Sequence, residues 1–393
     1  MKPYEKFVEN ILGAVRSSQG QNPAAATAII QEALSAAGLM GGAAPVSKPT
    51  QEKTAPFVDL NPPPAWAAKF RQPVAQPDSA GTNAGAGTST GTAMPDWMAR
   101  FASNLPGQAG AGKAVDPATH GPGQFLEGSF GNEAGTRNYR LYVPARPAAG
   151  PRPLVVMLHG CKQNPVDFAA GTTMNLLAEE SGCLVLYPEQ AASANHSQCW
   201  NWFEGAHQQR DGGEPSLIAG MTRQVLREHD GDASRVFVAG LSAGGAMAAV
   251  MAAGYPELYA AAGVHSGLPV GAAHDLMSAL NAMKGARRKP APSGARPVRT
   301  IVFHGDRDAT VHPSNGEAVY RQFTQSAGTQ ETEERGSEYT RSVARDASGQ
   351  SVAEHWLLHG AGHAWSGGST AGSYATSSGP NASGEMLRFF LQQ

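Results

Sequence analysis

The residues best suited to chemistry in this chain surround a serine, Ser242, within the sequence Gly-Leu-Ser-Ala-Gly at residues 240–244. The apolar, β-branched segment at residues 235–239 precedes it and predicts a buried strand. A run of small residues without proline follows at 245–253 and predicts a helix. In so tight a turn the flanking residues must be nearly free of side chains, and the helix N-terminus behind the serine favours negative charge. The sequence therefore predicts that Ser242 is a nucleophile.

A nucleophilic serine needs a base and an acid that orients the base. Asp308 lies in the loop after an expected strand, and we expect it to be the acid, with Asp306 as the alternative. His363 lies in a glycine-containing loop past the expected strand at residues 354–358. We expect His363 to be the base, with His359 as the alternative. The chain order of serine, acid and histidine fits a catalytic triad.

The negative charge that forms during attack by a serine requires an oxyanion hole of two backbone N–H groups. Ala243, directly after the nucleophile, is expected to supply the first. Cys161 follows the expected strand at residues 154–158 and a His-Gly pair, and is expected to supply the second. The His159 side chain is interpreted as shaping this loop, and His159 is also a candidate substrate-binding residue.

The cysteines and the charge of the chain restrict its partners. Cys183 opens an apolar run and is expected to be a buried thiol, whereas Cys161 and Cys199 lie in loops and could pair. Their spacing does not predict a metal site. A formal net charge of −2 gives no general attraction to nucleic acid. The sequence contains no apolar run approaching the roughly 18 residues of a membrane helix, so no transmembrane segment is expected.

Composition divides the chain into three regions. Residues 1–42 predict an amphipathic helical hairpin, whose apolar faces would dimerise or dock on the main domain or on a partner. Residues 43–122 are rich in Ala, Gly, Pro and Thr and predict a linker. It contains a repeated Pro-x-Trp-x-Ala-Lys/Arg-Phe motif, at 64–70 and 95–101. Each copy could bind a hydrophobic surface or partner protein, or pack on the domain expected at 123–393.

The third region alternates between strand and helix signals. An opening hairpin is expected at residues 124–130 and 137–143, and helices are expected at 166–180, 215–229 and 314–324. Further strands are expected at 154–158, 183–187, 235–239, 261–265, 300–303 and 354–358. This alternation predicts an α/β fold with a mostly parallel sheet covered by helices. Catalytic groups should then gather at the carboxyl ends of the strands.

Several separated motifs of this region resemble one known family. They are His-Gly-Cys-Lys-Gln at residues 159–163 with Asp-Phe at 167–168, Tyr-Pro-Glu-Gln at 187–190, Cys-Trp-Asn-Trp-Phe at 199–203, Gly-Leu-Ser-Ala-Gly-Gly at 240–245, and Gly-His-Ala-Trp-Ser-Gly-Gly at 362–368. In this order they resemble the type 1 catalytic domain of the polyhydroxybutyrate (PHB) depolymerase family of esterases. That family has the α/β-hydrolase fold, and feruloyl and acetylxylan esterases are its relatives.

The resemblance implies an active site that needs no metal or cofactor. It also implies a disulfide between Cys161 and Cys199 near that site. Trp202 and Trp365 lie in loops that the resemblance places at the active site, and both are expected to form an apolar wall for the substrate. Trp200 is interpreted equally as part of this wall or as a core residue.

The resemblance implies hydrolysis of short-chain poly- or oligo(3-hydroxyalkanoate) esters through a Ser-His-Asp acyl-enzyme mechanism. One alternative is a carbohydrate esterase that removes feruloyl or acetyl groups. A second alternative is a catalytically silent polymer-binding protein of the same fold. The resemblance suggests an extracellular protein, but the first residues lack a secretory signal, so the sequence alone favours the cytoplasm.

Overall fold

The computed structural model of this chain describes residues 121–285, 298–324 and 328–392. The amphipathic hairpin expected at residues 1–42 and the Trp/Phe motifs of the expected linker lie outside these residues. The proposed division at residues 42 and 122 therefore stays a prediction.

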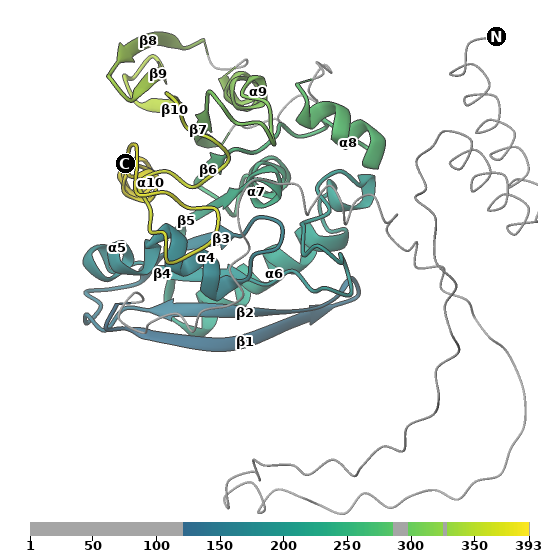
Figure 1. Ribbon diagram of the computed structural model, residues 1–393. Coiled ribbons are helices and arrows are strands. Elements are labelled where there is room, and N and C mark those ends of the chain that lie inside the picture. Colours follow the sequence, from purple (N-terminus) through teal and green to yellow (C-terminus); the bar gives the residue numbers. More distant parts are fainter. Residues whose placement is uncertain (1–120, 286–297, 325–327, 393) are drawn as a thin grey trace, which may run out of the picture. The chain divides into compact units, whose positions relative to one another are not determined.

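The described residues form a ten-stranded sheet with the order β1-β2-β4-β3-β5-β6-β7-β10-β9-β8 (Figure 1). From β4 to β10 in this order, neighbouring strands run parallel. These strands are β3 (Arg152–Leu158), β4 (Leu184–Pro188), β5 (Gly231–Leu241), β6 (Ala261–His265), β7 (Arg299–Gly305) and β10 (Ser351–Leu358). The predicted α/β-hydrolase class, with its mostly parallel sheet, is confirmed.

An antiparallel hairpin closes each edge of the sheet. The hairpin of β1 (Gln124–Asn132) and β2 (Gly135–Val143) was expected from the sequence, and β2 pairs antiparallel with β4. The hairpin of β8 (Gln330–Arg335) and β9 (Tyr339–Arg345) was not expected, and β9 pairs antiparallel with β10. All residues of β8 are exposed, so the apolar alternation that marks a half-buried strand is missing there.

Successive side chains of a strand point to opposite faces of the sheet, so the buried strands make both faces apolar, and helices cover each face. In β3, Leu154, Val156 and Leu158 belong to one core, and Val155 and Met157 belong to the other. The first core includes residues of α6 (Gly213–Glu228), α7 (Ala243–Gly254), α8 (Leu276–Met283) and α9 (Ser314–Thr324), and the second includes residues of α4 (Pro165–Thr172), α5 (Met174–Ser181) and α10 (Ala382–Leu391). None of the helices described is both long and apolar enough to cross a bilayer.

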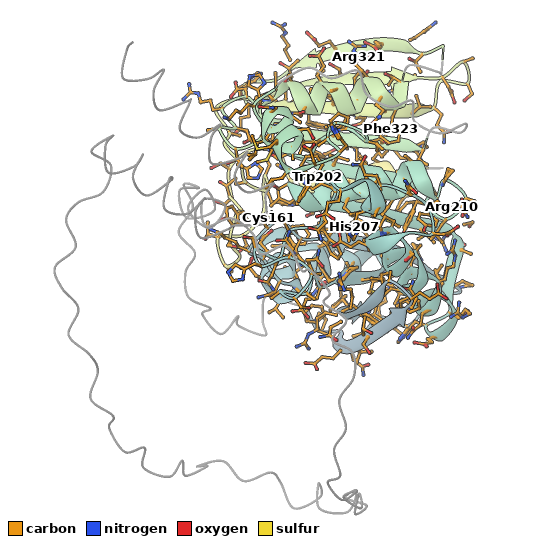
Figure 2. The ribbon with its side chains drawn as sticks, turned by 90° about the vertical axis from the view of Figure 1, so that its right-hand side faces the viewer. Cys161, Trp202, His207, Arg210, Arg321 and Phe323 are labelled. Carbon is orange, nitrogen blue, oxygen red and sulfur yellow. A yellow bond between two sulfur atoms is a disulfide. The ribbon has the colours of Figure 1, made fainter. Side chains whose placement is uncertain are left out.

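Helix α9 illustrates how amphipathic spacing fixes this packing. Phe323 is buried in the core, whereas Arg321 is directed outward and pairs with Glu331 (Figure 2). Residues three and four apart share a helix face, so Val319 and Tyr320 join Phe323 on the buried side.

The helix expected at residues 166–180 is wrong as a single element. It is two helices, α4 and α5, separated at Thr173, whose φ of 54° lies in the left-handed region. The amide N–H of Thr173 donates to the carbonyl of Ala169, which ends the first helix in a left-handed cap, a conformation that β-branched residues rarely adopt. The C-terminal helix α10 and the short helix α8 were not expected.

Candidate active site

Ser242 occupies the sharp turn between β5 and α7. Its φ of 58° and ψ of −118° are strained for a residue with a side chain. Its backbone N–H donates to the carbonyl of His265 on the neighbouring strand, at 2.9 Å. A Cβ atom at Gly240 would collide with the backbone of Gly244, and one at Gly244 would collide with the carbonyl of Leu158. The glycines of the motif are therefore required by close approach of the backbone.

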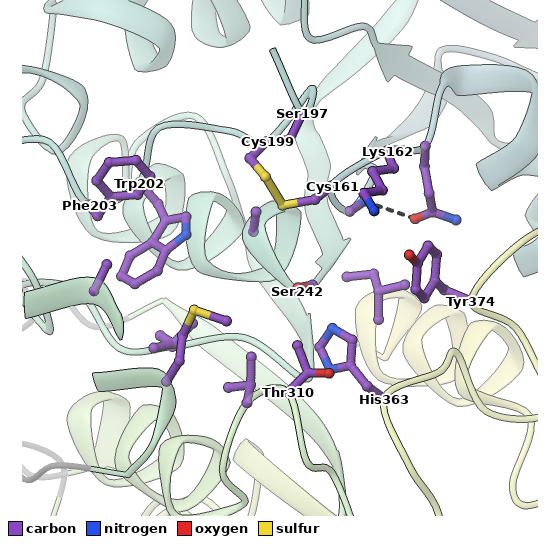
Figure 3. Close-up of a pocket in the computed structure, with 18 of the residues that line it drawn as sticks. Cys161, Lys162, Ser197, Cys199, Trp202, Phe203, Ser242, Thr310, His363 and Tyr374 are labelled. Carbon is purple, nitrogen blue, oxygen red and sulfur yellow. Dashed lines mark hydrogen bonds between the residues drawn. A yellow bond between two sulfur atoms is a disulfide. The ribbon is translucent and has the colours of Figure 1, made fainter. Parts of the chain in front are cut away.

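The structure brings Asp308 and His363 together. Asp308 follows the end of β7, His363 lies in the loop after β10, and these two strands are paired. The His363 Nδ1 atom lies 2.7 Å from the Asp308 Oδ2 atom. His363 also lines the same pocket as Ser242 (Figure 3). The three residues of the expected triad thus come from different loops to one site.

The two alternative residues are occupied elsewhere. The carboxylate of Asp306 accepts a hydrogen bond from the backbone N–H of Gly360 at 2.7 Å. The Nε2 atom of His359 contacts the Thr340 hydroxyl at 3.0 Å. Neither side chain lines the pocket. The geometry therefore favours Asp308 over Asp306 and His363 over His359.

The Asp308 carboxylate is buried and surrounded by donors. Its Oδ1 atom accepts from the backbone N–H groups of Thr310 and Val311, at 2.9 and 2.8 Å. Burial raises the pKa of Asp308, but hydrogen bonds from His304 and His363 outweigh it and hold that pKa well below its ordinary value. Asp308 is thus a carboxylate at neutral pH. His304 was not singled out from the sequence, although it stands at the end of an expected strand.

His265 was also missed, and it connects the nucleophile to the loop of the base. Its carbonyl accepts from Ser242, and its Nε2 atom accepts from the backbone N–H of Ser366 at 3.1 Å. The ring stacks on Phe303 and Trp365, with centroids 5.8 and 5.1 Å away. Burial and the nearby histidines lower the pKa of His265 to about 3, so the imidazole is neutral and can accept. Only its position at the end of β6 could have pointed to it.

The expected oxyanion donors lie on either side of Ser242. In the described part of the chain, the N–H groups of Cys161 and Ala243 donate to no protein acceptor, whereas the Gly160 N–H donates to the Gln163 side chain at 2.9 Å. Cys161 and Ala243 both line the pocket. Two free backbone N–H groups beside a serine can bind an oxyanion.

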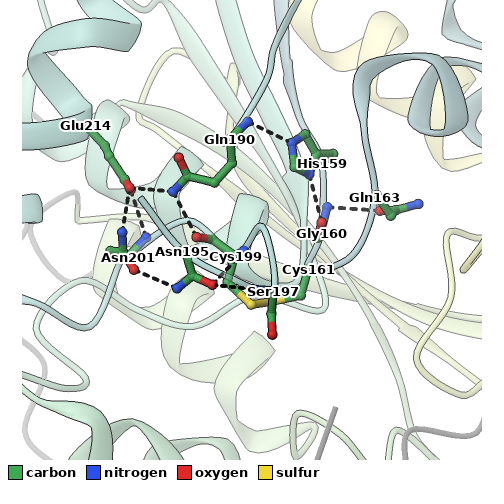
Figure 4. Close-up of a disulfide and its surroundings, with 10 residues drawn as sticks. All are labelled: His159, Gly160, Cys161, Gln163, Gln190, Asn195, Ser197, Cys199, Asn201 and Glu214. Carbon is green, nitrogen blue, oxygen red and sulfur yellow. Dashed lines mark hydrogen bonds between the residues drawn. A yellow bond between two sulfur atoms is a disulfide. The ribbon is translucent and has the colours of Figure 1, made fainter. Parts of the chain in front are cut away.

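Cys161 is bonded to Cys199 in a disulfide, and Cys183 is a buried free thiol. A buried polar network holds the Cys199 segment (Figure 4). The Gln190 amide donates to the Cys199 carbonyl at 2.9 Å and to Glu214, whose carboxylate also accepts from the Asn201 backbone and side chain. The disulfide thus ties the Cys161 loop to the Cys199 segment, and the buried hydrogen bonds hold that segment in place.

The structure corrects the substrate-binding role given to His159. The imidazole is fully buried and lies outside the pocket lining. Its Nδ1 atom lies 2.8 Å from the Gly160 carbonyl, and its Nε2 atom accepts from the Gln190 N–H at 3.1 Å. Both ring nitrogens therefore serve the protein, and His159 shapes the loop, as the other interpretation had it.

The pocket beside Ser242 encloses about 110 Å³ and is largely apolar. Trp202 lines it as expected, but Trp365 does not. Trp365 is buried in the core, where its indole N–H donates to the Ser383 hydroxyl at 3.0 Å. Trp200 is also a core residue. The lining consists of Gly160, Cys161, Lys162, Gln163, Ser197, Cys199, Trp202, Phe203, Leu241, Ser242, Ala243, Leu268, Leu276, Ala279, Leu280, Met283, Thr310, Val311, His363 and Tyr374.

Within residues 121–285, 298–324 and 328–392, no group of three or more His, Cys, Asp or Glu side chains could hold a metal ion. The pocket itself presents a serine hydroxyl, the imidazole of a histidine–aspartate pair and backbone N–H groups.

The sequence is similar to curated esterases. It is 33% identical over 251 residues to poly(3-hydroxyalkanoate) depolymerase C of Paucimonas lemoignei, covering 60% of each chain. It is also 33% identical over 224 residues to acetylxylan esterase A of Talaromyces purpureogenus, covering 52% of this chain and 57% of that protein. The chain thus spans about 60% of the length of these relatives.

A solved structure shares the fold. The acetyl xylan esterase from Aspergillus awamori superposes with a TM-score of 0.54 at 24% sequence identity, covering 65% of this chain and 93% of that one. The family model described as esterase PHB depolymerase matches residues 137–344, slightly more than half of the chain. On this match, the chain belongs to the PHB depolymerase family of esterases.

Proposed function

We propose that this protein is a serine esterase whose catalytic triad is Ser242, His363 and Asp308. The observation that carries the proposal is the convergence of a strained serine and a histidine hydrogen-bonded to a buried aspartate on one pocket. Membership of an esterase family supports it. Acyl transfer by a serine needs these three residue types close together, with the acid bonded to the base.

In the proposed reaction, the Ser242 Oγ atom attacks the ester carbonyl carbon while His363 removes its proton. The N–H groups of Cys161 and Ala243 stabilise the negative oxygen of the tetrahedral intermediate. His363 then donates its proton to the alcohol oxygen, and the alcohol leaves an acyl-enzyme. A water molecule, deprotonated by His363, then attacks the acyl carbon. His363 returns that proton to the Ser242 Oγ atom as the acyl–serine bond breaks and the carboxylic acid leaves. Asp308 orients the imidazole and stabilises its positive charge.

The preferred substrates in this proposal are short-chain poly- or oligo(3-hydroxyalkanoate) esters. The similarity to a poly(3-hydroxyalkanoate) depolymerase and the apolar lining of the pocket support this choice. A carbohydrate esterase is the second candidate, because acetylxylan esterases match the chain at the same identity. The first candidate predicts faster cleavage of hydroxyacyl esters, and the second predicts faster cleavage of acetylated or feruloylated sugars.

The test compares p-nitrophenyl butyrate, a 3-hydroxybutyrate trimer, acetylated xylan and methyl ferulate with one enzyme preparation. The highest kcat/KM on the trimer supports the hydroxyalkanoate assignment. A higher value on acetylated xylan or methyl ferulate supports the carbohydrate esterase. If no ester is cleaved but polyester particles are bound, the protein is the catalytically silent polymer-binding protein.

For residues 1–122 we propose a role in delivery to a hydrophobic surface or partner. The support comes from the sequence alone: two amphipathic segments and two copies of the Trp/Phe motif at 64–70 and 95–101. Weak binding segments on a flexible linker raise the local concentration of the attached enzyme at its substrate.

A further inference from the structure

The pocket around Ser242 has two chemically different halves. Trp202 and Phe203 lie on one side of the serine, and His363 and Tyr374 lie on the other (Figure 3). Helix α8 adds only apolar side chains to the lining, and most of these side chains pack in the same hydrophobic cluster as Trp202 and Phe203, whereas Tyr374 packs against the other cluster. The two substituents of an ester carbonyl placed at Ser242 would therefore meet different surroundings.

The proton transfers of ester hydrolysis assign a substituent to each half. The histidine that accepts the serine proton must return it to the leaving alcohol oxygen, so the alcohol lies beside His363. The acyl chain then extends from Ser242 in the other direction, toward Trp202 and Phe203.

We propose that the first half is an acyl pocket and that it accepts an apolar acyl chain longer than acetyl. The acyl pocket is formed by Trp202, Phe203, Leu276, Ala279, Leu280 and Met283. Ala279 and Met283 set the chain length that fits. This inference rests on the proposed function and names the acyl group within it.

The sequence of α8 explains why it can form this wall. Its pocket residues are spaced at i, i+3, i+4 and i+7 from Leu276, so they share one helix face. The Asp275 and Ser278 side chains form a capping box at the start of the helix. At its end, the His312 N–H donates to the Met283 carbonyl at 2.7 Å. The helix is thereby tied to the segment that follows Asp308.

The extent of the apolar wall also disfavours acetyl as the natural occupant of the acyl pocket. The two halves together enclose about 110 Å³, and six apolar side chains line the first half. An acetyl group would leave most of the apolar wall in contact with water. A longer chain would bury that wall and gain binding with each added methylene.

The test measures kcat/KM for p-nitrophenyl acetate, butyrate, hexanoate and octanoate. For Ala279→Leu, which narrows the pocket, we expect the ratio of butyrate to acetate to fall by about 10-fold or more, the scale on which one methylene is discriminated. For Met283→Ala, which widens it, we expect the optimum to move toward hexanoate or octanoate. The matched control is Met277→Ala on the same helix, because Met277 is 63% exposed and lies outside the pocket.

Three outcomes decide the inference. A lower ratio in Ala279→Leu together with a longer optimum in Met283→Ala, with the profile of Met277→Ala unchanged, supports it. If Ser242→Ala abolishes hydrolysis but both pocket variants keep the wild-type profile, the acyl pocket is overturned while the esterase function stands. If no ester is hydrolysed in a Ser242-dependent manner, both fall. Circular dichroism checks that each variant is folded. If Ala279→Leu does not fold, the chain-length optimum of Met283→Ala decides the test by itself.

Discussion

The two sides of the site are held in place by different means. On the acid–base side, formed by the Asp308 and His363 loops, no covalent link is involved: the Asp308 carboxylate contacts His363 at 2.7 Å and His304 at 3.5 Å and accepts two backbone hydrogen bonds. On the oxyanion side, a disulfide ties Cys161 to Cys199, and a buried polar network holds the partner segment.

This difference follows from what each side must do. Protons move on and off His363 in every proposed cycle, so its partner must respond to a changing charge. The oxyanion donors are useful only if they stand ready where charge develops, so that no reorganisation is needed at the moment of reaction. A covalent bond next to a donor serves that purpose. Variants on the two sides of the site are therefore expected to lose activity and stability to different extents.

The largest effect is expected between the two sides, at the nucleophile. Ser242→Ala removes the attacking oxygen and should lower kcat by roughly 10⁴-fold or more. Burst and steady-state assays with p-nitrophenyl butyrate measure the loss, and thermal unfolding checks the fold. Retention of substantial activity would show that the catalytic serine is elsewhere.

On the acid–base side, Asp308→Asn should lower kcat by about 10⁴-fold, because the amide no longer holds the imidazole in the required tautomer. The matched control is Asp306→Asn, two residues away, because the Asp306 carboxylate accepts from the Gly360 backbone N–H and lies outside the pocket lining. The control should keep most of its activity. The opposite result, an inactive Asp306→Asn with an active Asp308→Asn, would reverse the assignment of the acid.

On the oxyanion side, Cys199→Ser should lower kcat by roughly 10- to 10²-fold, less than the 10²–10³-fold typical of deleting a donor. The N–H of Cys161 remains in this variant but is held less firmly. Loss of the crosslink should also destabilise the protein by about 2–5 kcal/mol. Cys183→Ala is the control, since Cys183 is a free buried thiol.

Thiol counting tests in the wild-type protein whether Cys161 and Cys199 are bonded. Denatured protein prepared under oxidising conditions should contain one free thiol, that of Cys183. A count of three free thiols would show that the disulfide does not form. A Cys199→Ser variant as active as the wild type would show that the disulfide is not needed to hold the Cys161 N–H.

Acid should destabilise the oxyanion side through His159. Burial lowers the pKa of His159 from 6.5 to about 4. Between these values the unfolded chain binds a proton that the folded chain does not. The contribution of His159 to stability is therefore complete above pH 6.5 and is lost as the pH falls toward 4, by about 3 kcal/mol.

Denaturant unfolding between pH 7 and 4 tests this expectation. His159→Gln keeps a donor and an acceptor without titrating, so its stability should fall less over that range. Buried His265 acts in the same direction on the acid–base side and should account for part of the remaining loss. An equal pH slope in wild type and His159→Gln would show that His159 is not buried as a neutral imidazole.

The elements and residues that are marked by a local sequence pattern could be predicted from the sequence. The serine motif has glycines on both sides because side chains there would collide with backbone, and such constraints are visible in the sequence. The β8–β9 hairpin was missed because β8 is exposed throughout. The helix break at Thr173 was missed because nothing in its residue type requires a left-handed conformation.

Residues that act by packing could not be predicted from one sequence. Trp365 stands in a loop next to His363 and was expected to face the substrate, yet it stacks on His265 within the core. His265 and His304 are joined to the site by strand order, which places β6 and β7 side by side. That order is a property of the whole sheet, and neither histidine lies near Ser242 or His363 in the sequence.

The smallest effect is expected from removing the residues before Gly121. The described residues that form the two sides of the site all lie between 121 and 392, so their contacts with one another are kept in a shortened chain that begins at Gly121. Such a chain should hydrolyse soluble p-nitrophenyl butyrate at close to the full-length rate but bind polyester particles less well. Equal binding of both chains to the particles would reject the delivery role. A loss of soluble-ester activity would instead show that the preceding residues stabilise the catalytic domain.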